Sequence, residues 1–548
     1  MVSVEKDIVK TDVLVIGGGP AGLMAAIRAA DLGVKDVVLA DKGNTLRSGN
    51  GGAGNDHFFS YIPEYHGNDT KPVLASLRHS LASFEGRSSM EQIWLDRSFE
   101  MVKIWESWGL DMTYQGRREF AGHNLAGLPN IFLKYAGGEQ KTLLTKQAKK
   151  CGVKIMNRVT VFELLKDDDR VTGALGYNTW DDNIIEFHAK TVFLGTGCCT
   201  RLYKSFTGLM FNMPNCPFNT GDGRAMALRA GAALMNLEFT GRWAGPKNFA
   251  RAGKGTWIGV FTNPSGNPVG PFASKPDRHR GDIIADAYPQ VFDDYMNSGR
   301  GPVYMDCRAA PQEDLDYMTY WLSHEGNEGL LAFLEEEGID FKKHIIEFGR
   351  YEQILTGGLL YNKRSETTVK GLYAAGDENQ LGMPRAVIWG WIAGENMAKY
   401  VKTASLGNPK NTKEQVEDKI ALVKDILGRK TGADWKEANT AIQELMSAYV
   451  GLTRSETLLD QASLNLSILK DKIPKSLVAR NGHELGRCFE VLNLLDLGAA
   501  VIFAAGERKE TRRSHHRPDY PFANPLLDKQ LLVTRKDGVF VGNWQKLD

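Results

Sequence analysis

The segment from Val13 to Asp41 constrains the fold more than any other part of the chain. It begins with an apolar run, which is followed by glycines in the spacing G-x-G-x-x-G at Gly17, Gly19 and Gly22. A helix-forming stretch and a second apolar run, which ends at Asp41, come next. The three glycines allow a tight turn, close approach of a pyrophosphate and close packing of helix on strand. The sequence therefore predicts an α/β domain that holds a dinucleotide with its phosphates at a helix N-terminus.

Residues outside this motif decide which dinucleotide is bound. Asp41 can accept hydrogen bonds from ribose hydroxyls, and a carboxylate at this position argues against the 2′-phosphate of NADP. The motif alone does not separate FAD from NAD. Three later segments, at 190–199, 218–232 and 367–377, resemble those that line an extended FAD in glutathione-reductase-like flavoproteins. Together they favour FAD, although each one alone is also compatible with an ordinary α/β turn.

A serine- and glycine-rich loop at 44–59, with the sequence NTLRSGNGGAGNDHFF, completes the expected cofactor site. By the same resemblance we expect Asp377 to contact the ribityl or pyrophosphate part of FAD, and Thr220 and Asp222 to shape the loop around the flavin. The full set of expected cofactor-binding residues is Gly17, Gly19, Pro20, Ala21, Gly22, Asp41, Lys42, Ser48, Gly49, Gly51, Gly52, Val159, Thr196, Gly197, Thr220, Asp222, Gly376 and Asp377.

Several motifs spread along the chain are shared with one flavoprotein family. RSGNGGAG lies where that family has its flavin loop, GAALMNLEF where the chain enters the substrate region, and KETRRSHHRPDYP, at 509–521, resembles its C-terminal E-x-R…R-x-D-Y-P segment. Over essentially its whole length the chain therefore resembles the succinate dehydrogenase/fumarate reductase flavoprotein family. Within it the likeness is greatest to the adenylylsulfate reductase alpha subunit, through segments such as SGRGPVYMDC and NKRSETTVKGLYAAGD.

The resemblance implies a fold class and a domain organisation. The expected fold is α/β, with a glutathione-reductase-like FAD domain, an inserted α+β capping domain and a C-terminal helical domain. The expected boundaries are 1–240 and 351–401 for the two parts of the FAD domain, 241–350 for the cap, 402–513 for the helical domain and 514–548 for a tail that can contact a partner subunit.

The hydrophobic pattern adds local detail. Apolar residues at i, i+3, i+4 and i+7 predict three helices, at 413–427, 435–451 and 455–473. The later part of the cap, 330–348, is expected to be helical as well. In the tail, the segment 531–544 predicts a hairpin with a polar Asp-Gly turn. The apolar run at 491–510 is interrupted by Asp496 and too short to span a bilayer, so it predicts a buried helix.

Composition limits the partners of the chain. The 67 basic and 66 acidic residues give a net charge of +1, so nothing indicates a nucleic-acid partner. The six cysteines lack the short spacings that iron–sulfur clusters and structural zinc require, so we expect no metal on this chain. The N-terminal residues contain no signal-like apolar region, and no transmembrane segment is predicted. We therefore expect a cytoplasmic protein.

The resemblance also implies an active site, from which this chain departs. Succinate dehydrogenases bind FAD covalently through a histidine whose position is taken by Thr45 here, so we expect a noncovalent flavin. The same family holds its dicarboxylate with two histidines and two arginines, because two carboxylates must be neutralised in a dry cleft. Those four positions carry Trp243, Gln353, Asp286 and Gln380. Fumarate or succinate is therefore not the expected substrate.

The contacts of adenylylsulfate reductase are altered as well. Glu139 matches the glutamate of that family's site, and Lys247 lies near its arginine and can meet an anion, though without the two-pronged geometry of a guanidinium. Pro214, Phe59 and Gly259 stand in place of its tryptophan, asparagine and leucine. A scaffold with this many changed contacts is expected to turn over a different substrate.

In place of the family's substrate contacts, the chain has aromatic residues and a few basic ones. Segments expected to face the flavin contain Phe58, Phe59, Trp243, Trp389 and Trp391, although packing is the common role of such residues. Arg385, beside the expected isoalloxazine, is the leading cation. His57 is an acid–base candidate, with a structural hydrogen bond as its alternative role. The catalytic candidates are Arg385, Glu139, His57, Trp243, Arg242 and Lys247.

These observations predict an FAD-dependent oxidoreductase subunit that exchanges a hydride or an electron pair between the flavin and a small substrate under the cap. As the resemblance implies, electrons would pass to or from a ferredoxin-like iron–sulfur subunit in a larger hetero-oligomer. The alternatives are an adenylylsulfate reductase that forms sulfite, a fumarate reductase or succinate dehydrogenase-type flavoprotein, a flavin subunit that only transfers electrons, and a flavoenzyme that needs no partner.

Overall fold

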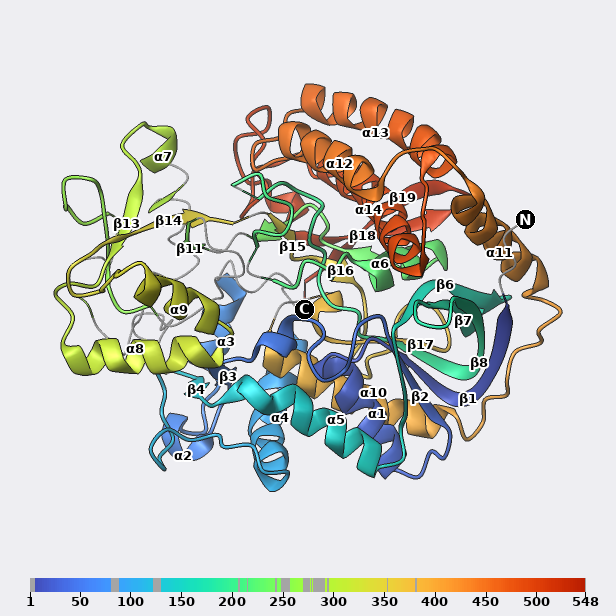
Figure 1. Ribbon diagram of the computed structural model, residues 1–548, viewed down its shortest axis with the longest axis horizontal. Coiled ribbons are helices and arrows are strands. Elements are labelled where there is room, and N and C mark those ends of the chain that lie inside the picture. The colour runs from blue at the N-terminus through green and yellow to red at the C-terminus, as the bar shows by residue number, and fades with distance from the viewer. Residues whose placement is uncertain are drawn as a thin grey trace.

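The computed structural model shows a chain divided between a twisted sheet with its helices, a bundle of long helices and a smaller lobe. In Figure 1 these parts lie at the lower right, the upper right and the left, respectively. The described residues are 5–79, 88–121, 130–205, 207–213, 215–241, 244–247, 257–269, 276, 278, 291–292, 295–351, 353–379 and 382–547.

The largest sheet contains the strands that the dinucleotide motif predicted. Its members are β1 (Lys6–Ile16), β2 (Val37–Asp41), β5 (Lys154–Asn157), β6 (Val159–Asp167), β7 (Arg170–Asn178), β8 (Asn183–Leu194) and β17 (Leu372–Ala374). The order is β5-β2-β1-β8-β7-β6, and β17 pairs with the second half of β8. β1 and β2 run parallel, with Val13 opposite Val37, and are joined by α1 (Pro20–Asp31).

The C-terminal half of β1 is an apolar run because both faces of the sheet are covered there. Val13, Leu14 and Val15 have no exposed surface. α1 packs against α10 (Met383–Tyr400) and α5 (Gln140–Lys150). Gly390 of α10 permits this close approach, since a Cβ there would lie 2.3 Å from the carbonyl oxygen of Ala21.

The smaller lobe has a hydrophobic core of its own and falls within the expected cap. Its sheet has the order β11-β14-β13-β12, from β11 (Ala244–Pro246), β12 (Val260–Thr262), β13 (Val303–Asp306) and β14 (Ile346–Arg350). Its helices are α7 (Tyr295–Asn297), α8 (Gln312–His324) and α9 (Glu328–Glu336). Trp257, Phe261 and Phe348 pack edge to face between sheet and helices. The pair β10 (Thr240–Gly241) and β15 (Ile354–Leu355) brings the entering and leaving chain side by side.

The C-terminal part is helical where periodicity predicted it to be. The helices are α11 (Lys413–Gly428), α12 (Trp435–Tyr449), α13 (Glu456–Ser476) and α14 (Gly482–Glu507). The expected hairpin is also confirmed, because β18 (Lys529–Lys536) and β19 (Val539–Lys546) pair across a turn in which Asp537 and Gly538 have φ angles of 48° and 81°. β18 extends a small sheet with β9 (Leu234–Met235) and β16 (Gly358–Leu359).

One local expectation is wrong. The segment 330–348 is not one helix: α9 ends at Glu336, the chain turns at Gly338 with φ 68°, and β14 begins at Ile346. The buried helix predicted for the apolar run at 491–510 is confirmed as α14, which starts earlier, at Gly482, because the Asn481 side chain accepts a hydrogen bond from Glu484 N and caps it. Among the described helices, α14 is the one long and apolar enough to cross a membrane, and 78% of its most apolar window is buried in the protein.

The remaining described elements are β3 (His57–Phe59), β4 (Phe132–Lys134), α2 (Pro63–His66), α3 (Lys71–His79), α4 (Ser88–Ser107) and α6 (Asp222–Arg229), with short 3₁₀ helices at Asn50–Ala53, Gly137–Glu139, Gly376–Glu378 and Pro525–Leu527. Of these, β3, β4, α2 and α3 lie beside the smaller lobe in Figure 1. β3 and β4 are antiparallel, and their register sets His57 opposite Lys134. This pairing joins the end of the glycine-rich loop to a segment that is distant in the sequence.

Candidate cofactor cavity and active site

A cavity of about 670 Å³ lies where the glycine turn, the loop 47–59 and the helical part meet. Its wall includes the turn 16–21, the end of β2, the start of β6, the segment 215–219 and the start of α10. One face of α14 contributes His483, Gly486, Arg487 and Glu490. The smaller lobe contributes Glu325, which follows α8. The cavity therefore touches all three parts of the chain.

The glycine turn has the geometry that a pyrophosphate needs. A Cβ on Gly17 would lie 2.3 Å from the carbonyl oxygen of Gly195, and one on Gly22 would lie 1.9 Å from that of Gly17. Gly19 lines the cavity, and a Cβ there would project into the space beside the turn. Pro20 and Ala21 begin α1 at the cavity wall, so the partial positive charge of the helix end faces the space.

Asp41 is held at the wall where a ribose would lie. Its carboxylate accepts hydrogen bonds from Gly18 N at 2.7 Å, Gly43 N at 2.8 Å and Ser48 Oγ at 3.1 Å. These bonds fix both carboxylate oxygens without removing Asp41 from the cavity lining. The arrangement matches the role expected for an acid at the end of the second strand.

A buried network of charges adjoins Asp41. Lys42 Nζ lies 2.7 Å from Asp222 Oδ2 and 2.9 Å from Glu490 Oε1, and Arg201 and Arg487 also contact Glu490. Although burial opposes the carboxylate, Lys42, Arg201 and Arg487 lower the pKa of Glu490 to about 2. Burial likewise opposes the ammonium, but the two carboxylates raise the pKa of Lys42. Lys42 and Glu490 therefore both stay charged at this end of the cavity.

The expected cofactor-binding residues line this cavity, except for Gly22, Gly52, Thr220 and Gly376. Those four support the wall: Thr220 Oγ1 bonds Asp222 at 2.9 Å, and a Cβ on Gly52 would lie 2.0 Å from the carbonyl oxygen of Arg47. Asn50, which the sequence did not single out, links the wall by donating to Asp377 at 3.0 Å and accepting from Cys216 N at 2.7 Å. The glycine turn, the fixed carboxylate and the cavity volume together fit FAD.

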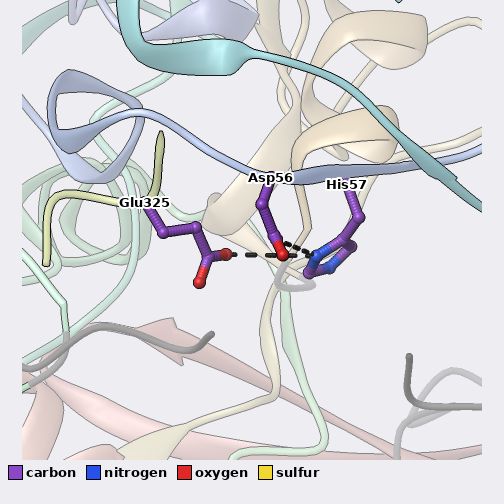
Figure 2. Close-up of side chains that lie close together, drawn as sticks. All are labelled: Asp56, His57 and Glu325. Carbon is purple, nitrogen blue, oxygen red and sulfur yellow. Dashed lines mark hydrogen bonds and ion pairs between the residues drawn. The ribbon is translucent and has the colours of Figure 1, made fainter. Parts of the chain in front are cut away.

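Three titratable side chains meet at another part of the same wall. Figure 2 shows Asp56, His57 and Glu325 pointing toward one another, the first two from the loop and β3 and the third from the end of α8. Asp56 Oδ1 lies 2.5 Å from His57 Nδ1, and Glu325 Oε1 lies 4.0 Å from the same nitrogen. His57 and Glu325 line the cavity, whereas Asp56 is fully buried behind them.

Lys134 completes this group from β4. Its Nζ lies 2.6 Å from Asp56 Oδ2, and both side chains are fully buried. Although burial alone would raise it, Lys134 and His57 hold the pKa of Asp56 well below its usual range. Ligand atoms of Asp56, His57 and Glu325 lie within 4.8 Å of one another, as in a metal site. The Lys134 ammonium on Asp56 disfavours a divalent cation there.

Backbone contacts set the position of Glu325. Gly54 has φ 100°, and a Cβ on it would lie 2.2 Å from the carbonyl oxygen of His324. Gly326 has φ 80°, and a Cβ there would lie 3.0 Å from that of Ala53. The flavin loop and the end of α8 therefore meet through two glycines, which brings Glu325 to the pair of Asp56 and His57.

Of the aromatic residues expected to face the flavin, Phe59 lines the cavity. It stacks near His57, with ring centroids 5.5 Å apart, and meets Phe132 edge to face at 4.2 Å. Phe58 packs against Trp105 in the core. Trp389 and Trp391 are also buried in packing, the latter under the guanidinium of Arg28 at 4.6 Å.

Three of the catalytic candidates are engaged elsewhere. Arg385 bonds Glu91 at 3.0 Å and lies over Trp94 at 4.6 Å, while its neighbours Pro384 and Ala386 line the cavity. The Glu139 side chain is 68% exposed and pairs with Arg47 at 2.7 Å. Lys247 pairs with Glu347 across the edge of the cap sheet. None of the three lines the described cavity.

The other residues expected at the substrate site either lie away from the cavity wall or fall outside the described residues. Gln353, at an expected histidine position, donates to Thr240 Oγ1 at 3.1 Å and is not part of the cavity wall. Gly259, at the expected leucine position, lies in the cap, where a Cβ would be 2.6 Å from Met305 Sδ. The remaining expectations fall outside the described residues, at Arg242, Trp243, Asp286, Gln380 and Pro214.

Known families and structures agree with this geometry. The FAD binding domain family matches residues 12–386, and the fumarate reductase flavoprotein C-terminal family matches residues 439–546. One of the subunits of fumarate reductase (CoM/CoB) from Methanothermobacter marburgensis is 24% identical over 98% of this chain and 100% of its own. L-aspartate oxidase of Yersinia pestis is 25% identical over 93% of this chain and 96% of its own length. Adenylylsulfate reductase from Archaeoglobus fulgidus superposes with a TM-score of 0.85 at 20% identity, over 99% of this chain and 96% of that chain.

These matches confirm three expectations: the flavoprotein family, the α/β fold class with its FAD and C-terminal domains, and FAD as the cofactor.

Proposed function

Because this chain belongs to the FAD-binding family of fumarate reductase-type flavoproteins and is an FAD-dependent oxidoreductase, we propose that it reacts with a small substrate at the His57 end of its cavity. The observation that carries this proposal is the continuity of the cavity wall from Gly17 and Asp41 to His57, Phe59 and Glu325. With the pyrophosphate at the glycine turn, an extended dinucleotide directs its ring toward that other part of the wall. FAD, when bound, supplies the two-electron chemistry.

We assign to His57 the exchange of a proton with the substrate. Asp56 fixes its Nδ1 at 2.5 Å, and Lys134 fixes Asp56 in turn, so the imidazole is held by a chain of charges anchored in β4. The four groups Lys134, Asp56, Glu325 and protonated His57 carry a net charge of zero when both carboxylates are ionised. A hydride and a proton can then be delivered or removed on the same small molecule.

The wall around His57 favours a substrate that is less negatively charged than a dicarboxylate. The group of Lys134, Asp56, Glu325 and protonated His57 has no excess positive charge to neutralise two carboxylates, and the nearby guanidinium of Arg385 is already paired with Glu91. We further propose that FAD is bound noncovalently, since the position of the family's histidine is the buried Thr45. We propose that electrons pass to or from an iron–sulfur partner subunit, because no described cysteine group on this chain could hold a cluster.

The test is anaerobic reduction of the FAD-loaded protein by a panel of two-electron donors, and reoxidation by the corresponding acceptors. For the donor or acceptor that reacts, H57Q is expected to lower the rate of flavin reduction or reoxidation by about 10²- to 10⁴-fold while FAD stays bound. H344Q, in the cap and away from the cavity, is the matched control. An unchanged rate in H57Q would refute its assigned role.

The panel also separates the alternatives. Rapid turnover of fumarate would contradict the proposed charge preference, and release of sulfite from adenylylsulfate would identify the chain as an adenylylsulfate reductase. Flavin that exchanges electrons with an iron–sulfur protein but with no small molecule would identify an electron-transfer subunit.

A further inference from the structure

A lysine lies fully buried beneath the glycine turn. Lys141 is in the first turn of α5 and has no exposed surface, and its Nζ donates a hydrogen bond to the carbonyl oxygen of Gly18. Gly18 N is bonded to Asp41, so the same residue joins the lysine to the ribose-binding carboxylate. The amine therefore contacts the backbone that is to hold the FAD pyrophosphate, while Lys141 itself is not part of the cavity lining.

Without a ligand, this position is a poor one for a positive charge. The ammonium sits at the N-terminal end of α5, and the turn that it bonds leads directly into the N-terminal end of α1. Both helix ends carry partial positive charge. The groups that act on Lys141 from other elements are Asp41, at the end of β2, and the Cys216 thiol, in the segment 215–219. Burial outweighs these two groups and lowers the pKa of Lys141 to about 8.

We propose that Lys141 is the residue through which FAD binding is coupled to proton uptake: the two phosphate charges at the glycine turn convert its amine to the ammonium, and the proton comes from solvent. This inference concerns the cofactor site alone and does not depend on the role proposed for His57. No covalent bond between heavy atoms changes in this step; one proton moves from water or buffer to Nζ.

The sign of the effect follows from linkage. In the free protein Lys141 is protonated below pH 8 and neutral above it, whereas the phosphates keep it protonated in the complex. Binding at pH 7 then takes up about 0.1 proton, and binding at pH 9 takes up about 0.9 proton. The affinity for FAD should fall above pH 8, approaching tenfold for each pH unit.

The experiment is isothermal titration of the apoprotein with FAD at pH 7 and pH 9, in pairs of buffers with different ionisation enthalpies. The dependence of the observed heat on the buffer gives the number of protons taken up. K141M is expected to take up no proton at pH 9, and its affinity should lose the pH dependence. K141R keeps a charge at both pH values, so it is expected to bind FAD with a pH-independent affinity and no uptake.

Two controls make the result specific. K149M removes an exposed amine from the same helix and should behave as the unaltered protein. ADP-ribose, which has the pyrophosphate and adenosine but no flavin ring, should show the same uptake as FAD, which excludes ionisation of the ring. Absence of uptake at pH 9 in the unaltered protein would overturn the proposal. So would full uptake in K141R, which is also the variant that reports if K141M does not fold.

Discussion

A fully buried lysine lies behind the wall at each end of the cavity: Lys141 at the cofactor end, beside the glycine turn, and Lys134 at the proposed substrate end, beside His57. The two lysines differ in the group that their amines contact. At the substrate end, Lys134 Nζ meets a carboxylate, Asp56 Oδ2, at 2.6 Å. At the cofactor end, Lys141 Nζ meets a backbone carbonyl, and the nearby carboxylate of Asp41 is shared with Gly18, Gly43 and Ser48. The charge of Lys134 is neutralised within the protein by Asp56. The charge of Lys141, as proposed above, is stabilised by the phosphates of the bound FAD.

This difference separates a permanent structural charge from one that responds to binding. A buried ion pair of good geometry holds its groups in place, and removing one partner leaves the other as an uncompensated charge. A buried amine on a carbonyl has a smaller electrostatic gain, and burial lowers its pKa, to about 8 for Lys141. The charges at the substrate end are therefore set before any ligand arrives, whereas the charge of Lys141 at the cofactor end depends on the arrival of FAD.

The largest expected effect is the loss of the Lys134 charge. K134M leaves the Asp56 carboxylate buried without this counterion, so we expect the protein to lose about 3–5 kcal/mol of stability. The double variant K134M/D56N removes both charges and should lose less than K134M alone. Urea unfolding at pH 7.5 measures both.

K141M in the same assay distinguishes the two lysines. It replaces a poorly compensated amine with an apolar side chain of similar length, so its cost should be smaller than that of K134M. An equal loss of unfolding free energy in K134M and K141M would contradict the view that the Lys134 charge is paired within the protein while the Lys141 charge is poorly compensated.

A second prediction uses the sign of a pKa shift at the cofactor end. Glu378 is fully buried and accepts bonds from Thr196 N and Oγ1, both at 2.6 Å; burial raises its pKa to about 7 from a usual 4.5, against the effect of Thr196 and Arg224. The unfolded chain loses this proton first, so the group destabilises the fold as the pH rises from 4.5 to 7. E378Q should therefore gain roughly 3 kcal/mol at pH 8 and little at pH 4.5.

E490Q is the matched control for that experiment. The pKa of Glu490 is lowered to about 2, so its contribution to stability is present above pH 4.5 and is lost as the pH falls toward 2. E490Q should accordingly lose stability at pH 8. Melting temperatures of the two variants at pH 4.5 and pH 8 provide the measurement, and a gain for both variants at pH 8 would contradict the assignment.

The cofactor end could be predicted because backbone geometry determines it. Gly17 and Gly22 are required by contacts within 2.3 Å of backbone atoms, and only glycine satisfies such contacts, so the spacing is visible in the sequence. Asp41 follows from the length of the strand–helix–strand unit. Lys141 could not be predicted. It lies at the start of α5, which α1 covers, and the sequence there does not show which side of the helix is apolar and which is polar.

The substrate end was predicted in part. His57 was singled out, but the adjacent Asp56 was not. Lys134 and Glu325 come from distant segments, Lys134 through the pairing of β3 with β4 and Glu325 through the close contacts of Gly54 and Gly326. Arg385 shows the limit most clearly, since its neighbours Pro384 and Ala386 line the cavity while its own side chain turns to Glu91. Consecutive residues of a helix point about 100° apart around its axis, and a sequence motif does not show which of them faces the cavity.

The smallest expected effect tests the resemblance against the geometry. The resemblance assigns Glu139 to the substrate, but its carboxylate is 68% exposed and forms a surface pair with Arg47. Such a pair contributes about 0.5 kcal/mol or less, so E139A should change stability slightly and the rate of flavin reduction by less than about twofold. E139Q controls for the side-chain volume. A fall of roughly 100-fold in E139A would show that Glu139 reaches the substrate when the cap closes, and would move the substrate end from the Asp56–His57 group toward the start of α5.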